Sequence, residues 1–167
     1  MIALLSVFNL VLTFAVARRI SGTAQQTPAL PGNRLLSGSP LPEFAAVTRS
    51  DGPVTRADLS GEALIGFFSS TCEPCLEQAR EFVVTARALP GGRDAALAVV
   101  KGGGPLEEEL VQLVEPAARV VVESSGDGLI DAFGIKIWPS FLSVGPEGNT
   151  AWVPPSGGRL VSAGGAG

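Results

Sequence analysis

The chain has 167 residues, 46% of them hydrophobic and 17% charged, which is typical of a globular protein large enough to bury a core. Its formal net charge of −4 argues against a nucleic-acid partner, because phosphate backbones favour a basic surface. Histidine is absent, which excludes a Cys-His nucleophile pair and any histidine metal site. Catalysis near neutral pH must therefore depend on cysteine, carboxylates, lysine or backbone dipoles.

Residues 1–17 carry no charged side chain and are followed by Arg18 and Arg19. At about 1.5 Å per residue this run is about 26 Å long, slightly shorter than a bilayer core of roughly 30 Å. We therefore expect residues 1–20 to form one transmembrane anchor, with a cleaved signal peptide or a soluble helix as the alternatives. By the positive-inside rule the two arginines favour a domain on the cytoplasmic side.

Residues 21–40 are small, polar and proline-bearing, without apolar periodicity, which is typical of a flexible linker. We expect the folded domain over residues 41–154. The glycine-rich residues 155–167 are unlike a stable helix and are expected to form a disordered tail.

Within the domain, apolar runs and turn residues predict strands that alternate with helices. A turn signal at residues 49–53 predicts an N-terminal β-hairpin. The remaining strands are expected at residues 63–69, 95–100, 119–123, 140–144 and 150–153. Helices are expected at residues 72–89, from Pro105 onward, and at residues 128–133. This order indicates an α/β domain with a mixed central sheet flanked by helices.

The two cysteines of the chain, Cys72 and Cys75, lie where the strand at residues 63–69 meets the following helix. Unpaired amides and partial positive charge at a helix N-terminus stabilise a thiolate, so Cys72 is a candidate nucleophile. Cys75 lies one turn further along and can attack a mixed disulfide formed at Cys72. Pro74 suits the first turn, where its missing N–H costs nothing, and Glu73 opposes part of the dipole's effect.

Other uses of this pair are less consistent with the sequence. A CxxC pair is half of a zinc site, but the chain supplies no third ligand, so we expect neither a metal nor another cofactor. A purely structural disulfide between residues so close in sequence closes too small a loop to stabilise the fold much. The strand–CxxC–helix context favours redox activity.

Several short motifs follow one another in the domain: Phe67 to Cys75 before a long helix, Phe133 to Ile135, Trp138 to Phe141, and Gly145 to Gly148. In this combination the chain resembles the thioredoxin-like proteins of the TlpA, ResA and CcmG group. The opening residues 41–44 and the Asp51-Gly52 hairpin resemble the MauD-like branch especially. The resemblance covers about residues 41–152.

The resemblance implies a thioredoxin-like fold and thiol–disulfide exchange with other proteins. It implies that Pro139 is cis and faces the cysteine pair, shaping a groove for an extended substrate chain. We expect Glu73 and Pro74 to contact the substrate too, and Trp138, where the family usually has a smaller residue, to fill or roof the groove. The resemblance further implies a reductant outside the cytoplasm, acting on apocytochromes or another maturing enzyme and resupplied by a membrane electron donor. The arginine pair and the resemblance predict opposite sides of the membrane for the domain. We follow the resemblance and expect the domain outside the cytoplasm.

The sequence also departs from the family. Thr71 replaces the tryptophan before the first cysteine, Gln78 replaces a common acid, and Gly66 stands at the buried aspartate of thioredoxin. No obvious carboxylate is then left to take the proton of Cys75. The closing helix of the fold is missing from the sequence pattern.

Two alternative functions are a peroxiredoxin-like thiol peroxidase and a redox-inactive binding module. The peroxidase motif Pro-x-x-x-Thr-x-x-Cys would require proline at Ile65 and threonine at Ser69, and the chain has neither.

Overall fold

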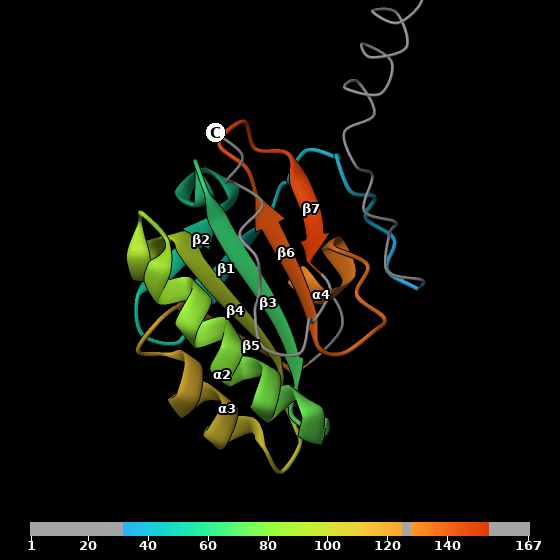
Figure 1. The fold of residues 1–167 in the computed structure, drawn as a ribbon. Helices are drawn as coiled ribbons and strands as arrows, with labels where there is room; N and C mark the ends of the chain where they lie inside the picture. Colours follow the sequence, from blue (N-terminus) through green and yellow to red (C-terminus); the bar gives the residue numbers. More distant parts are fainter. Residues whose placement is uncertain (1–31, 125–127, 154–167) are drawn as a thin grey trace, which may run out of the picture.

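The computed structural model describes residues 32–124 and 128–153, and within them five strands form a central sheet of order β5-β4-β3-β6-β7 (Figure 1). The strands are β3 (Ala63–Ser69), β4 (Ala96–Lys101), β5 (Arg119–Glu123), β6 (Ser140–Val144) and β7 (Thr150–Val153). Strands β3, β4 and β5 run parallel, whereas β6 is antiparallel to both β3 and β7. The mixed sheet predicted from the sequence is confirmed.

A two-stranded hairpin precedes this sheet, formed by β1 (Ala45–Thr48) and β2 (Gly52–Thr55). The Thr48 hydroxyl donates to the carbonyl of Gly52 at 2.8 Å and accepts from the amide of Asp51 at 2.9 Å. Gly52 has φ +81°, a left-handed conformation that glycine adopts without steric cost. The predicted hairpin is therefore present, and the short 3-10 helix η1 (Arg56–Leu59) follows it.

The helices divide between the two faces of the sheet (Figure 1). Helices α2 (Glu73–Ala88) and α3 (Glu107–Val114) lie side by side over one face, and the short η2 (Gly92–Ala95) leads from α2 into β4. The hairpin, η1 and the short α4 (Leu129–Ala132) supply buried residues to a second core on the other face. The sheet is thus enclosed between two apolar cores.

Strand β3 lies at the centre of both cores, and all of its residues are buried. Leu64 and Phe68 point into the core beneath α2 and α3, whereas Ile65 and Phe67 point into the opposite one. This alternation is the normal consequence of successive strand side chains facing opposite sides. A continuous apolar run, rather than an alternating one, is therefore what the sequence shows at this strand.

An aromatic cluster joins α2 to the sheet. The Phe68 ring lies 5.5 Å from that of Phe82 and 5.7 Å from that of Phe141, centroid to centroid. Gly66 makes room for this cluster, because a Cβ there would lie 2.8 Å from both Phe68 and Phe82. Close packing of α2 on β3 therefore requires glycine at this position.

The segment expected as a linker is folded over its last part, which moves the expected domain boundary at residue 41 toward the N-terminus. The Gly38 amide donates to the carbonyl of Thr150 at 2.6 Å, and the Thr150 amide donates back to Ser39 at 2.9 Å. The indole N–H of Trp152 donates to the Leu35 carbonyl at 2.6 Å. These contacts use backbone groups, so no apolar periodicity marks them in the sequence.

The expected anchor at residues 1–20, most of the expected linker and the tail at residues 155–167 lie outside the described residues, as does any closing helix beyond β7. Among the helices that the structure describes, none combines the length and apolarity needed to cross a membrane.

We predict that Gly66→Ala lowers the free energy of unfolding by about 1–3 kcal/mol, because the new methyl group overpacks the phenylalanine cluster. Chemical denaturation of the reduced protein measures this change. Gly145→Ala is the matched control, since its Cβ would lie 3.6 Å from the nearest atom, an ordinary contact. Equal stability of the two variants would contradict the prediction.

Candidate functional site

Cys72 occupies the N-cap of α2, between the end of β3 and the first turn of the helix. Its backbone is extended, with φ −111° and ψ 103°, and its side chain is partly exposed. Its amide donates to the Ser69 carbonyl at 3.1 Å, and its own carbonyl accepts from the Cys75 amide at 3.0 Å. Pro74 lies in the first turn, where it removes no helical hydrogen bond. The thiol thus lies at the positive end of a sixteen-residue helix.

Cys75 has a very different environment, since it is fully buried beneath α2. Burial, followed by hydrogen bonding to the Cys72 side chain, raises the pKa of the Cys75 thiol to about 12. The Ser69 amide donates to the Cys75 sulfur at 3.5 Å, and this hydrogen bond offsets part of the rise in pKa. Both cysteines are free thiols in this structure. The pair therefore combines an accessible sulfur with a protected, protonated one.

No carboxylate among the described residues hydrogen-bonds to the Cys75 thiol. At Gly66, where the thioredoxin aspartate would stand, the rings of Phe68 and Phe82 fill the space that a side chain would need. Gln78 is partly buried on α2 and carries no charge. The proton of Cys75 must therefore leave without the usual internal base.

The loop between β3 and α2 is fixed against the loop that follows β4. The Gly104 amide donates to the Ser70 hydroxyl at 2.8 Å, and the Leu106 amide donates to the Ser70 carbonyl at 3.0 Å. A Cβ on Gly104 would lie 2.5 Å from that same carbonyl oxygen, so only glycine permits this approach. Thr71, at the family's tryptophan position, instead places its hydroxyl 3.0 Å from that of Ser69. These contacts hold the residues just before Cys72.

The Trp138–Pro139 peptide bond is cis, as the resemblance implied. Ser140, the first residue of β6, pairs with Phe67 near the carboxyl end of β3, so Pro139 lies at the same end of the sheet as Cys72. Trp138 is half-buried and packs against residues of both cores, whereas Cys72 packs against the core beneath α2.

The remaining predicted substrate residues, Glu73 and Pro74, are exposed on the first turn of α2. The structure thus brings the cysteine pair and the cis-proline loop to one end of the sheet.

Sequence reasoning missed one polar residue of this region, Asn33. Its side-chain carbonyl accepts from the amides of Lys136 and Ile137, at 2.8 and 3.3 Å, and its NH₂ donates to the Ser140 hydroxyl at 3.0 Å. A single asparagine in a stretch of small polar residues carries no sequence signal for such a role.

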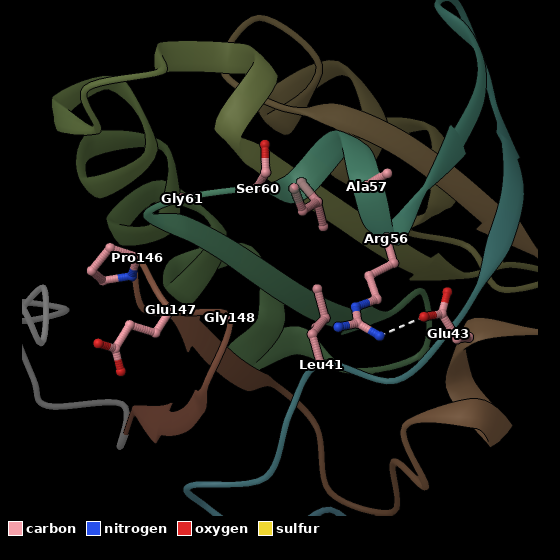
Figure 2. Close-up of a pocket in the computed structure, with 10 residues that line it drawn as sticks. Leu41, Glu43, Arg56, Ala57, Ser60, Gly61, Pro146, Glu147 and Gly148 are labelled. Carbon is pink, nitrogen blue, oxygen red and sulfur yellow. Dashed lines mark hydrogen bonds and ion pairs between the residues drawn. The ribbon is translucent and has the colours of Figure 1, made fainter.

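A cavity of about 470 Å³ lies elsewhere, at the end of β3 away from Cys72 (Figure 2). It is bordered by residues just before β3 and by the turn between β6 and β7, and the ion pair of Arg56 with Glu43 lies along it. Within residues 32–124 and 128–153 no group of three histidine, cysteine, aspartate or glutamate side chains could hold a metal ion.

No family model matches the chain, and no curated protein does. Solved structures do match, and the chain spans most of their length. A secreted disulfide oxidoreductase of Mycobacterium tuberculosis, homologous to E. coli DsbE, is 19% identical with a TM-score of 0.56, over 71% of this chain and 87% of that one. A putative thiol:disulfide interchange protein DsbE from Chlorobium tepidum is 20% identical with a TM-score of 0.54, over 70% and 83%.

The thioredoxin domain of a thiol-disulfide oxidoreductase from Bacteroides vulgatus is 16% identical with a TM-score of 0.53, over 71% of this chain and 88% of that chain. At these identities the similarity defines the fold, which is thioredoxin-like, as the sequence predicted. Two of these three proteins are described as DsbE or as homologous to it, and none of the three is described as MauD-like.

We predict that the step carried out by Cys75 accelerates about tenfold per pH unit across roughly pH 7–9, because only the thiolate attacks and its pKa lies above that range. Desolvation by burial, the main cause of the raised pKa, is separate from the smaller contribution of the Cys72 thiol. The measurement is stopped-flow release of nitrothiobenzoate from protein carrying it on Cys72. Cys75→Ser should release none, and a flat pH profile would refute the prediction.

Proposed function

We propose that this protein is a thiol–disulfide oxidoreductase that exchanges disulfides with the thiols of other proteins. The observation that carries the proposal is the arrangement of Cys72 and Cys75, with the first sulfur accessible at a helix N-terminus and the second buried one turn later. The cis-proline loop at the same end of the sheet supports a groove for a polypeptide substrate.

In the reaction the Cys72 thiolate attacks one sulfur of a substrate disulfide. This forms a mixed disulfide and releases the other substrate sulfur as a thiolate. Cys75, once deprotonated, attacks the Cys72 sulfur, releases the second substrate thiol and leaves a Cys72–Cys75 disulfide. Two electrons have then passed to the substrate, and a dithiol donor must reduce the pair again.

We infer that the protein acts as a reductant. Strongly oxidising members of this class have a stabilised reduced form. Here burial works against a Cys75 thiolate, and no described cationic side chain hydrogen-bonds its sulfur to offset this. Such an environment gives the reduced pair little extra stability and favours donation of electrons.

We further propose that residues 1–20 anchor the domain on the extracytoplasmic side of a membrane, as in the MauD-like branch that the opening residues resemble. The uncharged run at residues 1–17 supports the anchor. The secreted relative from Mycobacterium tuberculosis supports a location outside the cytoplasm. The partners would then be apocytochromes or another maturing enzyme, with a membrane dithiol protein as the electron donor.

Replacing Cys75 with serine should trap mixed disulfides between Cys72 and protein thiols, because the sulfur that resolves them is gone. We expect bands of higher mass on non-reducing gels that disappear on reduction. The Cys72→Ser/Cys75→Ser double variant is the matched control and should show none. The proposal fails if Cys75→Ser traps no partner while the purified wild-type pair does not cycle in a glutathione titration.

Reporter fusions at the C-terminus of the full chain test the proposed location. In a bacterial host, an alkaline phosphatase fusion should be active and a green fluorescent protein fusion dark, because the first matures outside the cytoplasm and the second inside. The same fusions lacking residues 1–20 should reverse this pattern. Fluorescence from the full-length fusion would contradict an extracytoplasmic domain.

A further inference from the structure

Asn33 connects the beginning of the described chain to the loop that carries Trp138 and Pro139. The residue is only 7% exposed, and its partner Ser140 lies 107 positions further along the chain. Its side chain makes three hydrogen bonds, all to the loop that carries the cis-proline or to the start of β6. A buried amide with this many partners is costly to replace, because the partners would lose their hydrogen bonds without gaining water.

These three bonds hold the loop from both sides of the cis-proline. Ile137 precedes Trp138 and donates to the Asn33 carbonyl, whereas Ser140 follows Pro139 and accepts from the Asn33 NH₂. The Ser140 hydroxyl in turn donates to the carbonyl of Ile137 at 2.6 Å, which closes the loop on itself. Trp138 and Pro139 therefore lie between two fixed points.

Neighbouring residues keep Asn33 against the loop. Arg34 donates its amide to the Gly134 carbonyl at 3.2 Å, and a Cβ on Gly134 would lie 2.6 Å from the Arg34 side chain. A Cβ on Gly32 would lie 3.1 Å from the side chain of Ile137. The chain before and after Asn33 thus runs in close contact with residues 134–137.

We propose that Asn33 is a positioning residue that sets the shape of the protein-binding surface around Trp138 and Pro139. This inference rests on the proposed function, since it concerns the same site. Asn33 does not bond to either cysteine in the described hydrogen-bond network, so its role lies in holding the loop against which a polypeptide substrate would bind. Small disulfides, which can react with the cysteine pair without filling this surface, should be insensitive to it.

The test compares Asn33→Ala with Ser37→Ala in the full-length chain. Ser37 is the matched control, because it lies in the same segment and its hydroxyl accepts one hydrogen bond, from the Trp152 amide at 3.2 Å, away from the loop. We expect Asn33→Ala to raise KM for reduction of insulin about tenfold, the size expected for lost hydrogen bonds at a binding surface. The rate with 5,5′-dithiobis(2-nitrobenzoate) should stay within about twofold, and Ser37→Ala should change neither.

A structural readout separates this inference from the proposed function. Amide hydrogen exchange of residues 134–140, measured by mass spectrometry, should be about tenfold faster in Asn33→Ala than in Ser37→Ala. Asn33→Asp keeps the acceptor for the Lys136 and Ile137 amides and should restore most of their protection.

Equal exchange and equal KM in the alanine variants would overturn the inference. If wild-type protein reduces neither disulfide, the proposed function fails, and the exchange data still decide the role of Asn33. Should Asn33→Ala not fold, Ser140→Ala removes the hydroxyl that Asn33 and Ile137 share. It should then raise KM for insulin in the same way, and an unchanged KM would overturn the inference.

Discussion

The packing of α2 on β3 determines the chemistry of this protein. Gly66 lets the Phe82 ring approach the strand, and the helix then starts directly over the strand's carboxyl end. This contact seals Cys75 in the core, while Cys72, three residues earlier at the N-cap, stays accessible. The packing of aromatic rings against this glycine is therefore associated with one buried and one partly exposed cysteine. It also removes the space in which an internal base could lie.

The two sides of the site are held by two separate sets of hydrogen bonds. The loop before Cys72 is held by Ser70, whose backbone and hydroxyl bond to residues after β4. The cis-proline loop is held by Asn33 from the beginning of the described chain. Both supports include hydrogen bonds from backbone amides, and hydrogen bonds are directional in a way that apolar contacts are not. The loop before Cys72 and the cis-proline loop therefore depend on different residues for their geometry.

The central strands, the hairpin and the helix that contains Cys75 could be predicted because apolar periodicity and turn residues follow directly from local burial. The cis form of Pro139 followed from the resemblance to a family rather than from periodicity. The roles of Asn33 and Gly104 could not be predicted. Each depends on a polar contact with a residue far away in sequence, and neither leaves a repeating pattern. For the same reason residues 33–40 looked like a linker, although several of them hydrogen-bond to the domain.

The pairing of residues 37–39 with β7 has a consequence for solubility. β7 is the last strand of its sheet, and an outermost strand with free amides and carbonyls is a template for joining another chain. Here the outward groups of Thr150 bond to Gly38 and Ser39, and the Trp152 amide bonds to the Ser37 hydroxyl. The segment thus occupies the sheet's open edge and protects the protein from strand-to-strand aggregation.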